Sequence, residues 1–594
     1  MQDKFKKQII KYEVELQQYS TIFNIVGYLK LAVLLIFIST VFLTFYKGFS
    51  YVFCVTGIAI LLLQVFLWIY HSKVHDSVNY AKAMIIINKQ YLDRISGDWV
   101  HFADIGEEFI DVKHPYACDL DIVGKKSLFQ LLNVTKTWHG RQAFANDLLN
   151  PDYNTTKLLS RQEAILELSK NIELSAKFQY HLSKIEKSDS ILRLLQDLKK
   201  KRSFIKSKFL KCLLVYCPLI TVTFIAAMII FQLKNFYLAG AALLLMQCIV
   251  WIAGVTKTNE YLGSLAGLNY KLATYSTVLS ILQNEKFTSA ELINIKKQLT
   301  SENLSAAQAI KDLGKISDRV NVRHQGIIWF ILNVLFLWDY ECAFMMEEWK
   351  EKYARTSENW FLALGEFESL LSFSTIPNVC SNVTLPDITN KSKVFEAMDI
   401  GHPLILNSAR VYNNIIDKNN IIIISGSNMS GKTTFLRTIG INLVMANAGG
   451  FVCAKTMTCS LFKIMTSMRI SDDLNDGVST FYAELKKIKR IIDTAKNSKN
   501  TIFLIDEIFR GTNSVDRLYG AKTIISKLDS FEVMGVITTH DLELCEMANQ
   551  YYRIKNYSFS EHYKENKILF DYKIRQGKSN TTNAKYLMQM VGIL

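Results

Sequence analysis

Four long runs of hydrophobic residues stand out along the chain, arranged as two close pairs. They occupy residues 29–46, 51–70, 212–233 and 236–256. Each run approaches the ~20 apolar residues that a membrane-spanning helix needs, and only a few residues separate the two members of a pair. The pattern therefore predicts two transmembrane helical hairpins, with two hairpins buried in a protein core as the alternative.

Elsewhere, hydrophobic residues recur at helical spacing. Residues 76–211 and 257–395 are predicted to form a helical core in two segments. Within the second segment, residues 326–338 are apolar but too few to cross a bilayer, so we expect a helix packed against its neighbours.

The last portion of the chain alternates buried strands with helices. Ile421–Ile424, Thr501–Ile505 and Val533–Thr539 are apolar runs typical of strands that are buried on both faces. This alternation predicts an α/β domain after the helical core. The expected domains are 1–75 (tail and first hairpin), 76–211 (first segment of the helical core), 212–256 (second hairpin), 257–395 (second segment of the core, or lever) and 396–594 (α/β domain).

Charge sets the predicted orientation in the membrane. The chain has 594 residues, a net charge of +15 and a mean hydropathy of +0.12. Because cytoplasmic loops are rich in Lys and Arg, the basic cluster at residues 199–211 predicts a multi-pass protein of the inner (plasma) membrane with its large segments in the cytoplasm. The same cluster also suits anionic lipid or nucleic acid as a partner.

The ten cysteines argue against a disulfide framework or a zinc motif. They are scattered, several within apolar runs, and none forms a C-x-x-C pair. This distribution favours a reducing compartment.

A phosphate-binding loop is predicted directly after the strand Ile421–Ile424. Gly426 to Thr433 has the spacing G-x-x-x-x-G-K-[ST], and a helical pattern follows it. Glycines let backbone N–H groups turn toward phosphate oxygens, Lys432 is expected at the β- and γ-phosphates, and Thr433 is expected to ligate Mg²⁺. The alternative is an ordinary Gly-rich turn. The predicted contact residues are Gly426, Ser427, Asn428, Met429, Ser430, Gly431, Lys432, Thr433 and Thr434.

Polar residues at the ends of two further strands complete the candidate site. Asp506 and Glu507 end the strand that begins at Thr501, and the first acid is expected to hold Mg²⁺ while the second activates water. His540 ends the strand Val533–Thr539 and is predicted to sense the γ-phosphate or to position water, with a solvated loop histidine as the alternative. Ser479 precedes a predicted helix and would contact the γ-phosphate of a second protomer if it faces one.

Together, GSNMSGKTT, SDDLNDGVSTF, FLIDEIFRGTNSVD and TTHDLEL resemble the ATPase domain of the MutS mismatch-repair family. The segments SLFQLLNVTKTWHGRQAFANDLLNP and GHPLIL resemble the start of that family's helical core and the opening of its ATPase domain. Ser427 and Ser430 stand where the family usually has proline and glycine.

The resemblance implies an ABC-type phosphate-loop ATPase that uses ATP and Mg²⁺ and works as a homodimer with composite sites. It implies one half-site made of Asn428, Lys432, Thr433, Asp506, Glu507 and His540, with Ser479 acting in trans and Tyr412 as the platform for the adenine base. The chain departs from repair MutS because the first hairpin stands where mismatch-reading domains would precede the core. The triplet Phe559-Ser560-Glu561 stands in the wrong context for a mismatch wedge, and we interpret it as chance.

Two functions from different classes follow. The first is a membrane-anchored MutS-type ATPase that couples nucleotide turnover to double-stranded DNA as a mismatch-repair-like sensor. The alternative is a membrane mechanochemical or signalling ATPase with the same MutS-type ATPase domain and no direct DNA role. A transporter is the weakest hypothesis, because the four apolar runs are almost uncharged and offer no evident substrate path.

Overall fold

The structure is a computed structural model that describes residues 2–48, 51–185, 191, 194, 196–197, 208–231, 236–301, 304–391, 393–469, 480–509, 513–564 and 567–579. Its contacts divide the chain into two compact units. The first unit comprises Met1–Leu132, Asn171–Tyr180 and Ser374–Leu594, and the second comprises Asn133–Lys170 and His181–Phe373. Both units are discontinuous in sequence.

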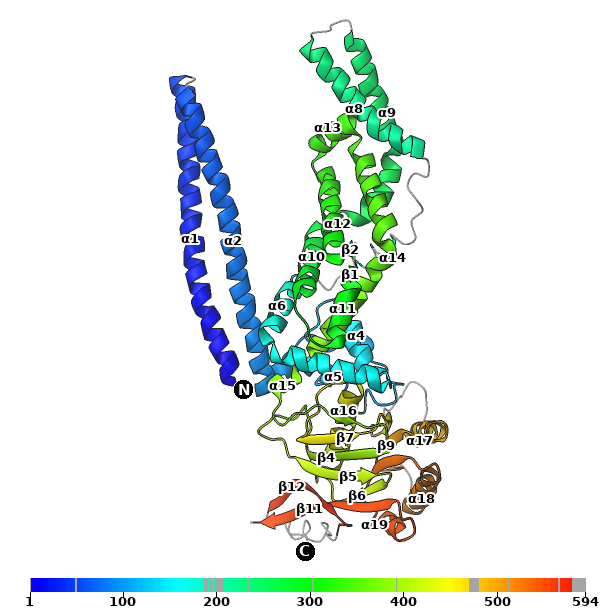
Figure 1. The fold of residues 1–594 in the computed structure, drawn as a ribbon. Helices are drawn as coiled ribbons and strands as arrows, with labels where there is room; N and C mark the ends of the chain where they lie inside the picture. The colour runs from blue at the N-terminus through cyan, green and yellow to red at the C-terminus, as the bar shows by residue number, and fades with distance from the viewer. Residues whose placement is uncertain are drawn as a thin grey trace. The chain divides into compact units, whose positions relative to one another are not determined.

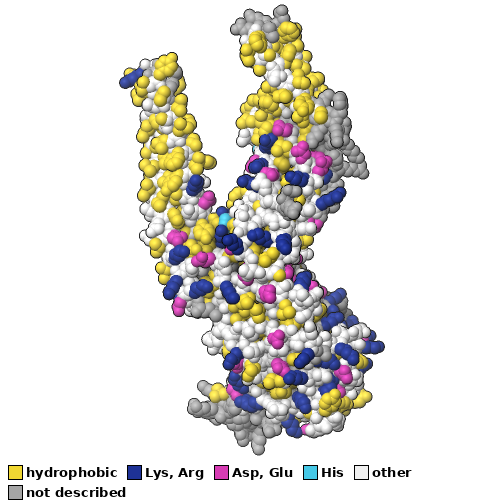
Figure 2. Space-filling view, viewed as in Figure 1, with side chains coloured by type: hydrophobic (Ala, Val, Ile, Leu, Met, Phe, Trp, Pro, Cys, Tyr) yellow, Lys and Arg dark blue, Asp and Glu magenta, His cyan; other side chains and the backbone are white. Residues whose placement is uncertain are grey.

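The first unit begins with two long helices, α1 (Gln2–Lys47) and α2 (Tyr51–Ser96), which lie side by side (Figure 1). Near one end of the pair, the rings of Phe5 and Tyr91 stack with centroids 4.8 Å apart. Toward the connection between the helices, hydrophobic side chains cover the surface (Figure 2), and Phe42 and Phe66 are 68% and 64% exposed. The polar segment before the first apolar run is therefore part of one continuous helix, because the helix begins at Gln2.

The chain between α2 and the helical core is mostly irregular, although the sequence pattern predicts helix there. Gly97, Gly106 and Gly124 have φ values of +100°, +66° and +100°, a conformation that ends helices and that glycine adopts without strain. The short elements of this segment are η1 (Asp98–His101), η2 (Glu107–Phe109) and α3 (Leu128–Leu132).

The α/β portion of the first unit is built on a six-stranded sheet in the order β12-β11-β6-β10-β9-β8. Five neighbouring strands run parallel, and β12 closes one edge antiparallel to β11. The three strands predicted from sequence lie next to one another in the middle of this sheet. The strands are β6 (Ile421–Ser425), β8 (Lys463–Ser467), β9 (Thr501–Asp506), β10 (Met534–Thr539), β11 (Ile554–Lys564) and β12 (Lys567–Gln576).

A second, four-stranded sheet in the order β3-β7-β4-β5 was not predicted. Its strands are β3 (Asp387–Ile388), β4 (Val394–Ile400), β5 (Asn413–Lys418) and β7 (Thr456–Cys459). The helices of this portion of the chain are α15 (Ile376–Val379), α16 (Lys432–Asn447), α17 (Thr480–Asn497), α18 (Ser514–Ser530), α19 (Leu542–Cys545) and η6 (Glu546–Asn549).

The described residues of the second unit are helical apart from loops and the two-residue strands β1 (Thr300–Ser301) and β2 (Leu304–Ser305). Two of its helices, α4 and α14, approach closely at Gly140 and Gly365, where a Cβ atom would lie 2.6 Å and 2.8 Å from its neighbour. The buried Glu368 carboxylate accepts hydrogen bonds from the backbone of Lys136 and Thr137 at 2.6 and 3.1 Å. The helices are α4 (Trp138–Leu149), α5 (Thr155–Lys170), α6 (Ile172–Ser183, shared with the first unit), α8 (Lys208–Ile230), α9 (Tyr237–Leu262), η4 (Gly263–Leu265), α10 (Asn269–Asn284), α11 (Ala290–Leu299), α12 (Ala306–Asn321), η5 (Val322–His324), α13 (Gly326–Phe336) and α14 (Trp338–Phe373).

Apolar helices in both units are candidates for membrane spans. Among the described residues, three helices are long and apolar enough to cross a membrane: α1, α2 and the run Tyr237–Leu265. Leu214–Ile230 is a shorter apolar helix, and it pairs with α9 through a buried hydrogen bond of 2.9 Å from Gln247 to Thr221. Helix α13 packs against its neighbours, as expected for residues 326–338, because Trp329 meets Trp251 of α9, but Asn333 alone among the residues of α13 is buried.

Candidate nucleotide-binding site

The predicted phosphate loop lies between strand β6 and helix α16, as the sequence pattern indicated. Gly426 and Gly431 have φ values of +152° and +104°. A Cβ atom at Gly426 would lie 2.9 Å from the Phe559 carbonyl oxygen, and one at Gly431 would lie 3.0 Å from the Tyr572 ring. Both positions therefore need glycine, which keeps the loop backbone open toward the space in front of it.

Lys432, the first residue of α16, is held inside the loop. Its side chain is buried, and Nζ donates to the carbonyl oxygens of Gly426 and Ser427 at 2.9 and 2.8 Å. The same Nζ lies 3.4 Å from Nε2 of His540. The ammonium group is thus fixed by its own loop and next to the end of strand β10.

Thr433 and Asp506 form the oxygen-rich portion of the site. Thr433 Oγ1 lies 3.0 and 2.9 Å from the two carboxylate oxygens of Asp506. Thr538 of strand β10 donates to the same carboxylate at 2.6 Å. Because β9 and β10 are parallel and pair Asp506 with Thr538, their carboxyl ends bring these side chains together.

Glu507 and His540 are in contact directly beside this group, with Nε2 of His540 2.7 Å from Oε1 of Glu507. Glu507 has a φ of +58°, which is uncommon outside glycine and is characteristic of functional sites. Its backbone N–H is fixed by the carbonyl oxygen of Thr538 at 3.2 Å. Both side chains are about one-third exposed, so a bound ligand has access to them.

Two serines of the loop, Ser427 and Ser430, differ in their surroundings. Ser427 donates to the buried carboxylate of Glu561, which sequence analysis interpreted as belonging to a chance triplet. Ser430 Oγ is buried and has no hydrogen-bond partner among the described residues. A buried hydroxyl without a partner is costly, and a phosphate oxygen at the loop would satisfy it.

A cavity of about 410 Å³ opens beside the loop and is large enough for a nucleoside. Tyr412 does not belong to the wall described for this cavity, and its hydroxyl lies 3.2 Å from Ser381 Oγ. The wall consists of His402, Ile405, Ala409, Val411, Asn413, Asn428, Met429, Ser430, Gly431, Lys432, Thr433, Thr434, Phe435, Thr438, Glu507, Phe559 and Tyr572.

Sequence analysis did not single out Tyr572 and His402, which both belong to this wall. Tyr572 on strand β12 approaches Gly431, and its ring packs against Phe570 with centroids 6.1 Å apart. Burial and then the nearby Arg437 and Arg410 lower the pKa of His402 to about 3, which keeps its imidazole neutral. Both residues reach the loop because segments that are distant in sequence pair in the fold. An aromatic residue on the last strand is a weak signal for Tyr572 in the sequence.

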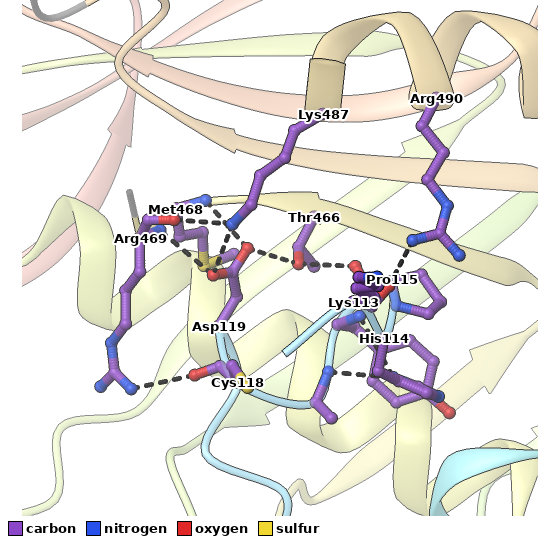
Figure 3. A network of polar contacts seen from close by, with 12 residues as sticks. Lys113, His114, Pro115, Cys118, Asp119, Thr466, Met468, Arg469, Lys487 and Arg490 are labelled. Carbon is purple, nitrogen blue, oxygen red and sulfur yellow. Dashed lines mark hydrogen bonds and ion pairs between the residues drawn. The ribbon is translucent and has the colours of Figure 1, made fainter. Parts of the chain in front are cut away.

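A third feature that sequence analysis missed is a polar network around Asp119 (Figure 3). Asp119 is buried, and its carboxylate accepts from Thr466 Oγ1 at 2.8 Å and from the backbone N–H groups of Met468 and Arg469 at 3.1 Å. Lys487 of helix α17 lies 3.4 Å from the same carboxylate. Asp119 therefore ties the segment before the helical core to the end of β8 and to α17.

Ser479 lies outside the described residues, so its predicted role in trans stays a prediction. The other predicted site residues lie at the carboxyl ends of β6, β9 and β10 or in the loop, apart from Tyr412. In the described portion of the chain, no cluster of three or more His, Cys, Asp or Glu side chains is arranged to hold a metal ion. Thr433 with Asp506 is thus the pair that suits Mg²⁺, which prefers oxygen ligands and shares its shell with phosphate and water.

Comparison with known proteins identifies sequences similar to this chain. Residues 422–593 match the family model described as MutS domain V. Similar curated proteins include those named DNA mismatch repair protein MutS from Acetivibrio thermocellus, Bacillus mycoides and Clostridium kluyveri, with identities of 33% over 219 residues, 31% over 235 and 25% over 357. The alignments cover 35%, 38% and 58% of this chain, but only 25%, 26% and 39% of these relatives.

Proposed function

Because this chain is a MutS-family protein, with MutS domain V over residues 422–593, we propose that it is an ATP hydrolase anchored in a membrane. The observation that carries the proposal is the meeting of Lys432, Thr433, Asp506, Glu507 and His540 beside one cavity. Lys432 and Thr433 begin α16, which follows β6, and the other three lie at the ends of β9 and β10, beside the carboxyl edge of the sheet where α/β proteins bind their ligands.

Each side chain has a distinct role in the proposed reaction. Lys432 exchanges its loop carbonyls for phosphate oxygens, and the loop N–H groups orient the triphosphate. Thr433 and Asp506 hold Mg²⁺, which when bound would neutralise charge on the phosphates. Glu507 accepts a proton from the attacking water, and His540, 2.7 Å away, orients the Glu507 carboxylate.

Two observations on the loop support its fit to phosphate. Ser430 Oγ is a buried donor without a partner among the described residues, and Gly426 and Gly431 leave no room for a side chain. On the base side, Tyr572 offers an aromatic face next to Gly431. The ring of Tyr572, rather than that of Tyr412, is therefore the base platform we propose.

Glu507→Gln tests the catalytic assignment. Removing the base while keeping its shape is expected to lower ATP turnover at least ~100-fold and to leave ATP binding intact. Glu543→Gln, an exposed acid on α19, is the matched control and should retain turnover. Undiminished hydrolysis by the Glu507 variant would reject the assignment.

The membrane anchor and the homodimer belong to the same proposal. The exposed apolar surfaces of α1, α2 and α9 suit the hydrocarbon of a bilayer. The family resemblance implies composite sites at a dimer interface, so turnover per chain should fall when the protein is diluted below its dimerisation constant. Mass photometry of the detergent-purified protein, with and without ATP, would measure that constant.

Double-stranded DNA is the proposed partner, in a sensor role like that of mismatch repair. The net charge of +15 supports an anionic partner. Binding of homoduplex and mismatched duplex should weaken steeply as salt rises, because phosphate contacts release counterions. The apolar helices favour a second candidate, a mechanochemical or signalling ATPase of the membrane, and absence of duplex binding at low salt would favour it.

A further inference from the structure

Helix α13 is a short apolar helix whose outer face is unusually exposed. Its eleven residues, GIIWFILNVLF, carry no charge and extend about 16 Å, roughly half the thickness of a bilayer core. Ile327, Ile328, Phe330 and Ile331 are 79%, 50%, 50% and 48% exposed. Contiguous exposed apolar residues of this kind mark a surface that meets a partner or a membrane.

A group of hydrogen bonds around Asp339 fixes the direction of α13. The helix that follows is bent by 79° relative to it. At this bend, the buried Asp339 carboxylate accepts from Arg323 Nε at 2.9 Å and from Trp329 Nε1 at 3.1 Å. The backbone N–H of Asp339 donates to Asn333 Oδ1 at 3.0 Å. These contacts hold the exposed face in a defined orientation rather than leaving α13 loosely attached.

The inner side of α13 packs on the apolar pair α8 and α9. Trp329 meets Trp251 of α9 edge to face, with centroids 5.1 Å apart. Helix α9 itself exposes Leu245, Ile249 and Ile252 to between 60% and 65%. Hydrophobic side chains gather around the upper portion of this unit in Figure 2. The face of α13 is therefore continuous with the apolar surface of its neighbours.

The segment before α13 is charged and polar. Arg319 and Arg323 precede the helix and form ion pairs with Glu341 and Asp339 at 3.1 and 2.9 Å. An apolar face that borders a polar, ion-paired segment matches the layering of a bilayer interface, where acyl chains lie next to polar headgroups.

We propose that α13 lies in the membrane interface, with Ile327, Phe330 and Ile331 among the acyl chains and the polar segment before the helix at the headgroups. Helix α13 would thus be a lipid-contacting element of the second unit in addition to the spanning helices. The inference rests on the proposed membrane anchoring of α9, on which α13 packs.

Photocrosslinking to lipid tests this proposal in the full chain. Benzoylphenylalanine replaces Ile331 in protein reconstituted into phosphatidylcholine–phosphatidylglycerol vesicles that contain radiolabelled lipid. Leu362 on α14 is the matched control, because it is 47% exposed against 48% for Ile331 and lies outside the apolar helices. Ile58 on α2, 61% exposed, reports on the membrane anchor independently. Each variant is used only if it keeps ATP turnover.

The inference requires lipid label at Ile331 within about threefold of that at Ile58, and about tenfold above that at Leu362. Label at Ile58 but not at Ile331 would overturn the inference and leave the membrane anchor standing. A crosslink from Ile331 to a second chain would overturn it in favour of self-association. Absence of lipid label at both positions would remove the proposed anchoring itself, and the inference with it.

Discussion

The aromatic ring of Tyr572 lies beside the motif residues of the proposed nucleotide site. In that proposal the motif residues would hold phosphate and metal, and the base would need an aromatic face to stack on. Tyr572 could provide this face, because strand β12 turns back along β11 and brings the ring to Gly431.

Tyr572→Ala should therefore raise the KM for ATP about tenfold with little change in kcat, since base stacking contributes ~1–3 kcal/mol. Steady-state kinetics would measure both constants. Tyr552→Ala, which removes an 84% exposed ring, is the control and should leave KM unchanged. An equal KM in both variants would exclude Tyr572 as the base platform.

His402 predicts a pH dependence of stability. Its pKa is about 3 in the folded chain, against 6.5 when exposed, because burial and nearby arginines disfavour the charged form. Below pH 6.5 the unfolded chain therefore binds a proton that the folded chain does not, so stability falls as pH falls. From pH 7.5 to 5.5 the expected loss is about 1.4 kcal/mol. Thermal unfolding of the wild type and of His402→Gln at both pH values would measure it, and a loss of equal size in the variant would contradict the assignment to His402.

At the scale of elements, Asp119 joins strand β8, helix α17 and the segment before the helical core. Its carboxylate has four donors, and an amide would offer only one oxygen to them. Asp119→Asn should therefore destabilise the first unit by ~1–3 kcal/mol, seen as a lower melting temperature. Asp493→Asn, an exposed acid on α17, should leave the melting temperature unchanged. If both variants melt alike, the network contributes nothing measurable.

These elements also show why the sequence predicts some of the site and misses the rest. The strand β6, the phosphate loop and α16 follow one another within about 27 residues, so a local pattern predicts all three. The acids after β9 and His540 after β10 were predictable because parallel strands end at the same edge of a sheet. The network of Asp119 joins residues about 350 positions apart, and the second sheet joins short strands from distant segments. No periodicity in the sequence carries that information. Likewise, the sequence pattern predicts that α13 packs on its neighbours, but apolar composition alone does not tell which of its faces stays exposed.

For the whole molecule, the apolar helices predict firm attachment to membranes. If the attachment were electrostatic, about 1 M salt would release the protein, since screening at that concentration acts within ~3 Å. We expect the full chain to stay in the membrane pellet after such a wash and after alkaline carbonate, and to enter solution only with detergent. Immunoblotting of the fractions would measure this, and recovery in the salt supernatant would contradict the anchor.

Lys432 already has two carbonyl partners within its loop, at 2.9 and 2.8 Å. An incoming triphosphate therefore trades one set of bonds for another, and its net gain is the difference between two satisfied arrangements. The two loop carbonyl oxygens therefore compete with phosphate oxygens for Nζ of Lys432. Nucleotide affinity should accordingly be modest, so that small shifts in the loop change the fraction of the protein that has nucleotide bound.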